Sequence, residues 1–316
     1  MASLKQKMGK VYLVGAGPGD PQLLTKKAER CIQQADVILY DQLVNPLLLH
    51  LSSVHTEWID VGKTPYTRTT QQERINALLI EKATTATYVV RLKGGDPSIF
   101  GRVTEEVETL RKHGIPFEIV PGITAASAAI SQLGRGLTER GVSTNITFTT
   151  GHFKNNEEND IDMTTIAHGG TLAIYMGIHR LPQLMTAIQR HIDGNLPVVV
   201  IFNASRPNQH IVSGTVTTII EQVQALPERL GPGLTIVGQV VRDVVVPSQS
   251  IKESLDTVWI EGERNEAMMV ALEYVDAGWA AVVDDRRFGE LHVSQCEKIA
   301  RMVEETTFTR KVTLSQ

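Results

Sequence analysis

Five short segments in the first half of the chain carry glycine or proline, a side chain that can move a proton, or both. They are Gly15–Asp20, Asp41–Val44, Gly62–Lys63, Gly94–Pro97 and Pro121–Ala125. Glycine permits positive φ and lets a ligand approach the bare main chain, so such turns can hold a polar small molecule. A single turn of this kind is equally consistent with a plain loop. The first has neither the dinucleotide-binding spacing nor the Lys-Ser/Thr ending of a phosphate-binding loop.

Each segment follows a short apolar or β-branched run that predicts a strand. The expected strands are Lys10–Val14, Val37–Tyr40, Thr56–Val61, Tyr88–Leu92 and Phe117–Val120. Periodicity and capping signals predict helices over Pro21–Gln34, from Pro46, from Thr69–Thr70, over Val103–Leu110 and over Ile123–Leu133. Strands that alternate with helices indicate a parallel sheet, whose turns meet beyond the carboxyl ends of the strands. We therefore expect the five segments to lie together at one edge.

The second half of the chain predicts a further α/β domain. Strands are expected at Asn145–Thr149, Thr171–Tyr175, Pro197–Phe202 and Leu234–Val237. The segment after Val246 is acidic, has helix-period stretches and shows no chemistry, so it is an accessory or oligomer-related extension or a fragment of another domain. The predicted fold class is α/β, with an N-terminal domain over residues 1–138, a C-terminal domain over 139–246 and an extension over 247–316.

The composition is that of a globular protein without a membrane span. The chain has 316 residues, 42% of them hydrophobic, and no apolar run approaches the ~18–20 residues that cross a bilayer. The N-terminus lacks the apolar core of a signal peptide, and Cys31 and Cys296 are the two cysteines, which favours the cytoplasm. A net charge of −4 argues against nucleic acid as a partner.

Five segments carry a resemblance to a known family. They are Val14–Asp20, Leu39–Val44, Val90–Arg102, Val120–Ala126 and Tyr175–Gly177. Together they resemble the tetrapyrrole methylases over roughly Lys10 to Val241, and the R-L-K-G-G-D-P-x-I-F-G-R stretch is the most specific part. The resemblance implies two α/β domains with a ligand cleft between them, usually in a homodimer. It also implies S-adenosylmethionine as methyl donor, S-adenosylhomocysteine as its product, and uroporphyrinogen III as the substrate.

The same resemblance implies a set of residues that contact the donor. These are Pro18, Gly94, Gly95, Asp96, Ile99, Thr124, Ala125, Met176 and Ala204. Asp41 would be the proton acceptor, Lys63 the proton donor, and Arg102 would belong to the same catalytic set. A ring carbon attacks the sulfonium methyl in line, which requires alignment, and then loses a proton to a carboxylate. Methylation at C2 and C7 would give precorrin-2 for sirohaem or cobalamin synthesis, with no metal required.

The tetrapyrrole substrate carries many carboxylates, so basic side chains are expected along the cleft. The candidates are Arg91, Lys93, Arg102, Arg140 and His152, and the alternative for each is a solvated charge or a structural ion pair. Two departures bear on the substrate, because Arg68 and Glu139 stand where the family usually has histidine. They keep two alternatives open: a methylase of a later corrin intermediate, and a binding protein that has lost catalysis.

Overall fold

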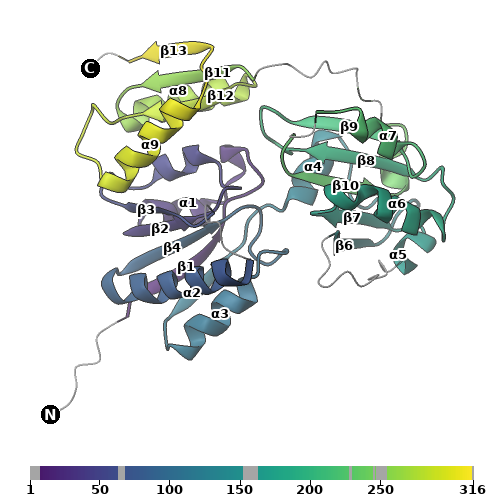
Figure 1. Ribbon diagram of the computed structural model, residues 1–316, viewed down its shortest axis with the longest axis horizontal. Coiled ribbons are helices and arrows are strands. Elements are labelled where there is room, and N and C mark those ends of the chain that lie inside the picture. The colour runs from purple at the N-terminus through teal and green to yellow at the C-terminus, as the bar shows by residue number, and fades with distance from the viewer. Residues whose placement is uncertain are drawn as a thin grey trace. The chain divides into compact units, whose positions relative to one another are not determined.

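The computed structural model describes residues 8–62, 68–151, 163–227, 230–244, 246 and 255–314 (Figure 1). The chain divides into two compact units. The first combines Met1–Thr124 with Ser254–Gln316, and the second is Ala125–Glu253. Both contain helices and strands in alternation, which confirms the predicted α/β class. Among the helices described, none combines the length and the apolarity of a membrane span.

The first unit is built on a five-stranded sheet. Its strands are β1 (Lys10–Gly15), β2 (Val37–Tyr40), β3 (Glu57–Asp60), β4 (Tyr88–Lys93) and β5 (Phe117–Val120). They are arranged in the order β3-β2-β4-β1-β5, and all neighbours run parallel. The five carboxyl ends therefore share one edge of the sheet, as the sequence predicts. This edge holds the glycine-bearing turns.

Helices cover both faces of this sheet, which explains why its inner strands are rich in buried apolar residues. On one face, α2 (Arg68–Thr85) and α3 (Val103–Lys112) pack through Leu79, Val107 and Leu110. On the other face, α1 (Lys26–Gln33) and η2 (Pro46–Leu51) contribute residues that share a core with β2 and β4; these include Ile32, Leu48 and Leu49.

The single helix predicted after the first turn is two helices, η1 (Pro21–Leu23) and α1. The Asp20 carboxylate accepts a hydrogen bond from the main chain of η1 at 2.8 Å. The Thr25 hydroxyl accepts one from the Ala28 N–H at 3.1 Å, and Thr25 itself has extended dihedral angles. Each side chain caps its own helix, so the chain restarts its helix at Thr25 rather than running through it.

The second unit contains a mixed sheet. Its elements are α4 (Ala125–Gln132), β6 (Ile146–Thr150), α5 (Thr164–Ala167), β7 (Thr171–Tyr175), η3 (Ile178–Arg180), α6 (Leu181–Gln189), β8 (Pro197–Phe202), β9 (His210–Thr215), α7 (Ile219–Gln224), β10 (Gly233–Val237) and η4 (Gln239–Val241). The strand order is β6-β7-β10-β8-β9. Because β7 and β8 are both antiparallel to β10, they run in the same direction and end at the same edge.

The C-terminal residues form a small parallel βαβαβ module. It consists of β11 (Thr257–Glu261), α8 (Arg264–Asp276), β12 (Ala280–Asp284), α9 (Val293–Glu305) and β13 (Arg310–Thr313), with strand order β12-β11-β13. The sequence predicts helix-period stretches and an apolar run over Gly278–Val283 here, but not the fold, because each strand is short. Within the first unit, the module packs beside the five-stranded sheet. Its α9 lies against β3 (Figure 1), and Leu47 of η2 joins the apolar core of the module.

The compact units divide the chain between residues 124 and 125, earlier than the predicted domain boundary at 138/139. The physical reason is α4, which packs through Ala126, Ala129 and Ile130 against the second sheet. The predicted extension over 247–316 contributes Ser254–Gln316 to the first unit.

Candidate functional site

The turns after β1 and β4 are joined by their main chains. The Gly95 N–H donates to the Gly17 carbonyl at 2.7 Å, and the Gly17 N–H donates to the Gly95 carbonyl at 3.2 Å. One residue earlier, the Ala16 N–H donates to the Lys93 carbonyl at 2.8 Å. The two glycine-rich turns therefore extend the pairing of β1 and β4 beyond the sheet.

The turn after β5 fits against the same pair of turns. A Cβ atom on Gly15 would lie 2.6 Å from the Gly122 nitrogen and 2.7 Å from the Gly95 carbonyl oxygen, so only glycine allows this approach. The Asp96 carboxylate accepts hydrogen bonds from the Gly122 N–H at 3.0 Å and the Ser98 N–H at 2.7 Å. Asp96 therefore fixes both its own turn and the next one.

The turns after β2 and β3 complete the cluster. The Asn45 side chain donates to the Gly19 carbonyl at 2.7 Å, and a Cβ atom on Gly94 would lie 2.6 Å from the Cβ atom of Leu43. The Gln42 side chain donates to the Gly62 carbonyl at 3.2 Å. All five predicted segments thus meet at one edge of the first sheet. Lys63, the predicted proton donor, lies outside the described residues.

Open space and backbone strain coincide at this edge. Gly95 has a φ of +70°, and a Cβ atom added to it would meet nothing within 4 Å. Phe100 and Arg102 have φ values of 54°, which is uncommon for residues other than glycine. Leu43 and Phe100 are large apolar side chains that are exposed here. Sequence analysis gave these two no separate role, although both lie within matched motifs.

The second unit has a comparable group of residues at the shared end of β7 and β8. Met176 follows β7 with a φ of 53° and is exposed. Asn203 and Ser205, on either side of the buried Ala204, have φ values of 49° and 64°. The Tyr175 hydroxyl accepts a hydrogen bond from the N–H of the second residue of α4 at 3.2 Å. Three predicted donor contacts, Ala125, Met176 and Ala204, therefore belong to this unit, and the other six belong to the first.

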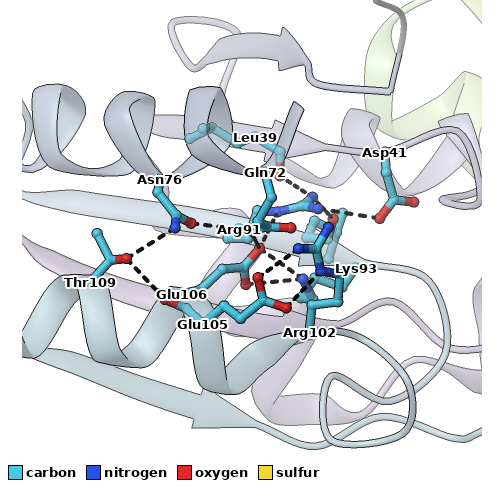
Figure 2. A network of polar contacts seen from close by, with 11 residues as sticks. Leu39, Asp41, Gln72, Asn76, Arg91, Lys93, Arg102, Glu105, Glu106 and Thr109 are labelled. Atoms are coloured by element: carbon cyan, nitrogen blue, oxygen red, sulfur yellow. Dashed lines mark hydrogen bonds and ion pairs between the residues drawn. The ribbon is translucent and has the colours of Figure 1, made fainter. Parts of the chain in front are cut away.

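Asp41, the predicted proton acceptor, lies in the turn after β2 (Figure 2). One carboxylate oxygen accepts a hydrogen bond from the Leu43 N–H at 3.0 Å. The other lies 3.5 Å from a terminal nitrogen of Arg91. The side chain is 26% exposed, so the carboxylate is held from two sides and still reaches solvent.

Arg91 and Lys93 are placed differently from the prediction that they face the substrate. Both are buried, and both are bound by Glu106, whose side chain is 0% exposed. Lys93 donates to the two Glu106 oxygens at 2.9 Å each, and the Arg91 Nε donates to one of them at 3.3 Å (Figure 2). Burial and the neighbouring charge of Arg91 lower the pKa of Lys93, and Glu106 opposes that shift. These cations belong to an interior ion-pair network.

Glu106 was missed because a charged residue in a helix is usually solvated. The signal lay in β4, where Arg91 and Lys93 alternate with apolar residues in an inner strand covered on both faces. A charge in such a strand must be paired, and the acid on the following helix is the nearest candidate.

The other predicted basic residues differ in position. Arg102 precedes α3 and is exposed; its hydrogen bonds to Glu105, at 2.7 and 2.6 Å, raise its pKa. Arg140 is exposed in the second unit. His152 and the side chain of Arg68 lie outside the described residues.

Glu139, which stands where the family usually has histidine, has a partner within its own unit. Its carboxylate accepts hydrogen bonds from Arg242 at 2.6 and 2.9 Å. This hydrogen bonding lowers the pKa of Glu139, which stabilises its ionised form. The negative charge is therefore matched by an adjacent guanidinium.

Residues 10–220 match the family model of the Tetrapyrrole (Corrin/Porphyrin) Methylases, which is more than half of the chain. The chain belongs to this family. The C-terminal module, from Thr257 onward, lies beyond the matched residues of this tetrapyrrole methylase.

Named relatives agree with this assignment. The chain is 45% identical over 237 residues to a uroporphyrinogen-III C-methyltransferase of Bacillus subtilis, and the similarity covers 74% of this chain and 91% of that protein. A siroheme synthase of Psychrobacter cryohalolentis is 42% identical over 81% of this chain, but over only 49% of its own length. The chain thus spans about half the length of the siroheme synthases that it matches.

A solved structure is also similar. It is the uroporphyrin-III C-methyl transferase of Thermus thermophilus in complex with S-adenosyl homocysteine, at 39% identity and a TM-score of 0.63. The similarity covers 74% of this chain and 99% of the Thermus chain. Among the described residues, no group of three or more His, Cys, Asp or Glu side chains is arranged to hold a metal ion.

Proposed function

We propose that this tetrapyrrole methylase transfers methyl groups from S-adenosylmethionine to C2 and C7 of uroporphyrinogen III and so produces precorrin-2. The donor is supported by the S-adenosyl homocysteine complex of the Thermus relative, and the acceptor by the names of the Thermus and Bacillus relatives. One observation carries the proposal. At the edge of the first sheet, open main chain at Gly95 and the carboxylate of Asp41 belong to one connected set of turns.

Open main chain at Gly95 suits a polar ligand such as a sulfonium nucleoside, because the ligand can approach it closely. We propose that the donor is held by the nine residues named by the family resemblance: Pro18, Gly94, Gly95, Asp96, Ile99, Thr124, Ala125, Met176 and Ala204. When bound, the donor supplies an electrophilic methyl group.

Asp41 is suited to take the proton that the methylated ring carbon must lose. The Leu43 N–H fixes one of its oxygens, and Arg91 lies 3.5 Å from the other. The side chain is partly exposed, so a substrate can approach it. Lys63 is proposed as the proton donor.

Binding of the acidic substrate falls to basic side chains that reach solvent. We propose that Arg102 and Arg140 pair with substrate carboxylates, because guanidinium groups bind them in bidentate fashion, and that His152 assists. We also propose that the protein works in the cytoplasm as a homodimer and that its product feeds sirohaem or cobalamin synthesis.

The test is a mass spectrum of the product formed from uroporphyrinogen III and S-adenosylmethionine. Two added methyl groups are expected, with loss of nearly all product in the Asp41→Asn variant. A product with one methyl group would limit the activity to the first transfer. No methylated product from correctly folded protein would contradict the proposal and favour a later corrin intermediate as the acceptor.

A further inference from the structure

A fully buried carboxylate stands behind the proposed proton acceptor. Glu106 of α3 lies beneath the carboxyl end of β4, and it holds Arg91 and Lys93 together (Figure 2). The Gln72 side chain also reaches Glu106, at 3.5 Å, and donates to Asn76 at 3.1 Å. Burying several charges is costly unless each is paired, so an arrangement of this kind calls for a reason beyond packing.

We propose that Glu106 is a positioning residue of the methylation site: by holding Arg91, it fixes the carboxylate of Asp41 where the proton is to be accepted. This inference rests on the proposed role of Asp41. Neither Glu106 nor Arg91 needs to contact the substrate in this role.

The geometry explains why Arg91 can transmit position. Its Nε is bound by Glu106, and one terminal nitrogen donates to the Leu92 carbonyl at 2.9 Å and lies 3.5 Å from the Leu39 carbonyl. The other terminal nitrogen faces Asp41. A guanidinium is planar and rigid, so fixing two of its nitrogens fixes the third. Arg91 therefore links the end of β2 to the end of β4.

Charged groups lie on both sides of β2. Arg91 and Lys93 approach from β4, with the anion of Glu106 behind them. On the other side of β2, Asp60 at the end of β3 is paired with Lys298 of α9 at 3.5 Å. Of these groups, Arg91 is the one that contacts the Asp41 carboxylate.

The decisive comparison is Arg91→Met against Lys93→Met. Both variants remove a buried cation of β4 that Glu106 binds, and only Arg91 reaches Asp41. For Arg91→Met we expect turnover to fall about 100-fold, because a displaced catalytic group costs about that much. We expect the loss to fall on kcat, with the affinity for S-adenosylhomocysteine unchanged. Lys93→Met should lose at least about tenfold less turnover.

Glu106→Gln should also lower turnover, because it weakens the hold on Arg91. Circular dichroism and the affinity for S-adenosylhomocysteine, measured by calorimetry, show that each variant is folded. If Glu106→Gln does not fold, the Arg91 and Lys93 variants still decide, because each leaves Glu106 with one cation.

Equal turnover losses in Arg91→Met and Lys93→Met would overturn the inference and make the network purely structural. Asp41→Asn is the reference for the proposed function. Full turnover in that variant would overturn the role of Asp41 itself, and the inference with it, whatever the Arg91 variant does.

Discussion

Two buried groups of charges in the first unit have similar composition and different surroundings. One joins Arg91, Lys93 and Glu106 to Asp41 at the edge that carries the glycine turns. The other joins Arg264 and Asp285 of the C-terminal module, at 2.5 Å, and lies next to the buried His50 of η2. The first ends at a carboxylate that reaches solvent. The second is buried, including Arg264, Asp285 and His50.

The second group fastens the module to the first sheet. Arg264 donates to the Ser52 carbonyl at 2.8 Å and to the Gln295 side chain at 2.7 Å. Gln295 in turn donates to the carbonyls of Ser53 and Thr56, at 2.9 and 2.6 Å. The carbonyls of Ser52, Ser53 and Thr56 all lie in the segment between η2 and β3. Buried charge alone therefore does not mark an active site. The group at the glycine turns differs from the other because one of its carboxylates reaches solvent.

The same chemical change in the two groups should have opposite consequences. Asp41→Asn removes the proposed base, so turnover should fall by about 10²–10⁴-fold with little change in stability. Asp285→Asn breaks a buried ion pair, so the free energy of unfolding should fall by about 3–5 kcal/mol while the folded protein keeps its turnover. Steady-state rates and urea unfolding measure the two effects. A large loss of turnover in folded Asp285→Asn would erase the distinction.

Acid should weaken the second group through His50. Burial lowers the pKa of His50 from its ordinary value of 6.5 to about 4; Asp285 opposes this shift and Arg264 adds to it. The unfolded chain therefore takes up a proton as the pH falls through 6.5, while the folded protein resists until about pH 4. Stability is unaffected by this group above pH 6.5 and should fall by about 3 kcal/mol across that window.

The check is urea unfolding at several pH values for the wild type and His50→Phe, which keeps a ring against Trp58. The variant should lose that part of the pH dependence. An identical pH dependence in both proteins would show that His50 does not titrate as the structure indicates.

The smallest effect is expected at the exposed rim of the second unit. Glu139→Gln removes the ion pair with Arg242, which is partly exposed and weak for that reason. We expect no resolvable change in the urea midpoint or in donor affinity. A marked gain in substrate affinity would mean instead that Glu139 repels the substrate carboxylates.

The sequence predicts most of the first sheet and its turns, because short apolar runs ending in glycine and aspartate are local signals. The close approach at Gly15 and Gly122 and the capping by Asp20 follow from residue type. The helix break at Thr25 is also a local capping effect, and it was overlooked because apolar periodicity continues across it.

The residue types of Arg91 and Lys93 do not predict their burial, because basic residues in a family motif such as Val90–Arg102 suggest an acidic ligand. Their partner lies on a helix 13 to 15 residues later, as the separations of the Glu106 contacts show. The fold of the C-terminal module was missed for a related reason: its three strands are short, and their pairing joins residues distant in sequence.

Exposed main chain at Gly95 is the proposed surface that binds the donor, and calorimetry with S-adenosylhomocysteine tests this most directly. Gly95→Ala and Gly114→Ala are matched, because both positions have positive φ, +70° and +65°, and open space around an added Cβ atom. Both should lose about 1–2 kcal/mol of stability from backbone strain. We expect wild-type affinity for Gly114→Ala and a loss of at least about tenfold for Gly95→Ala. Equal affinities in the two variants would contradict the proposed donor site.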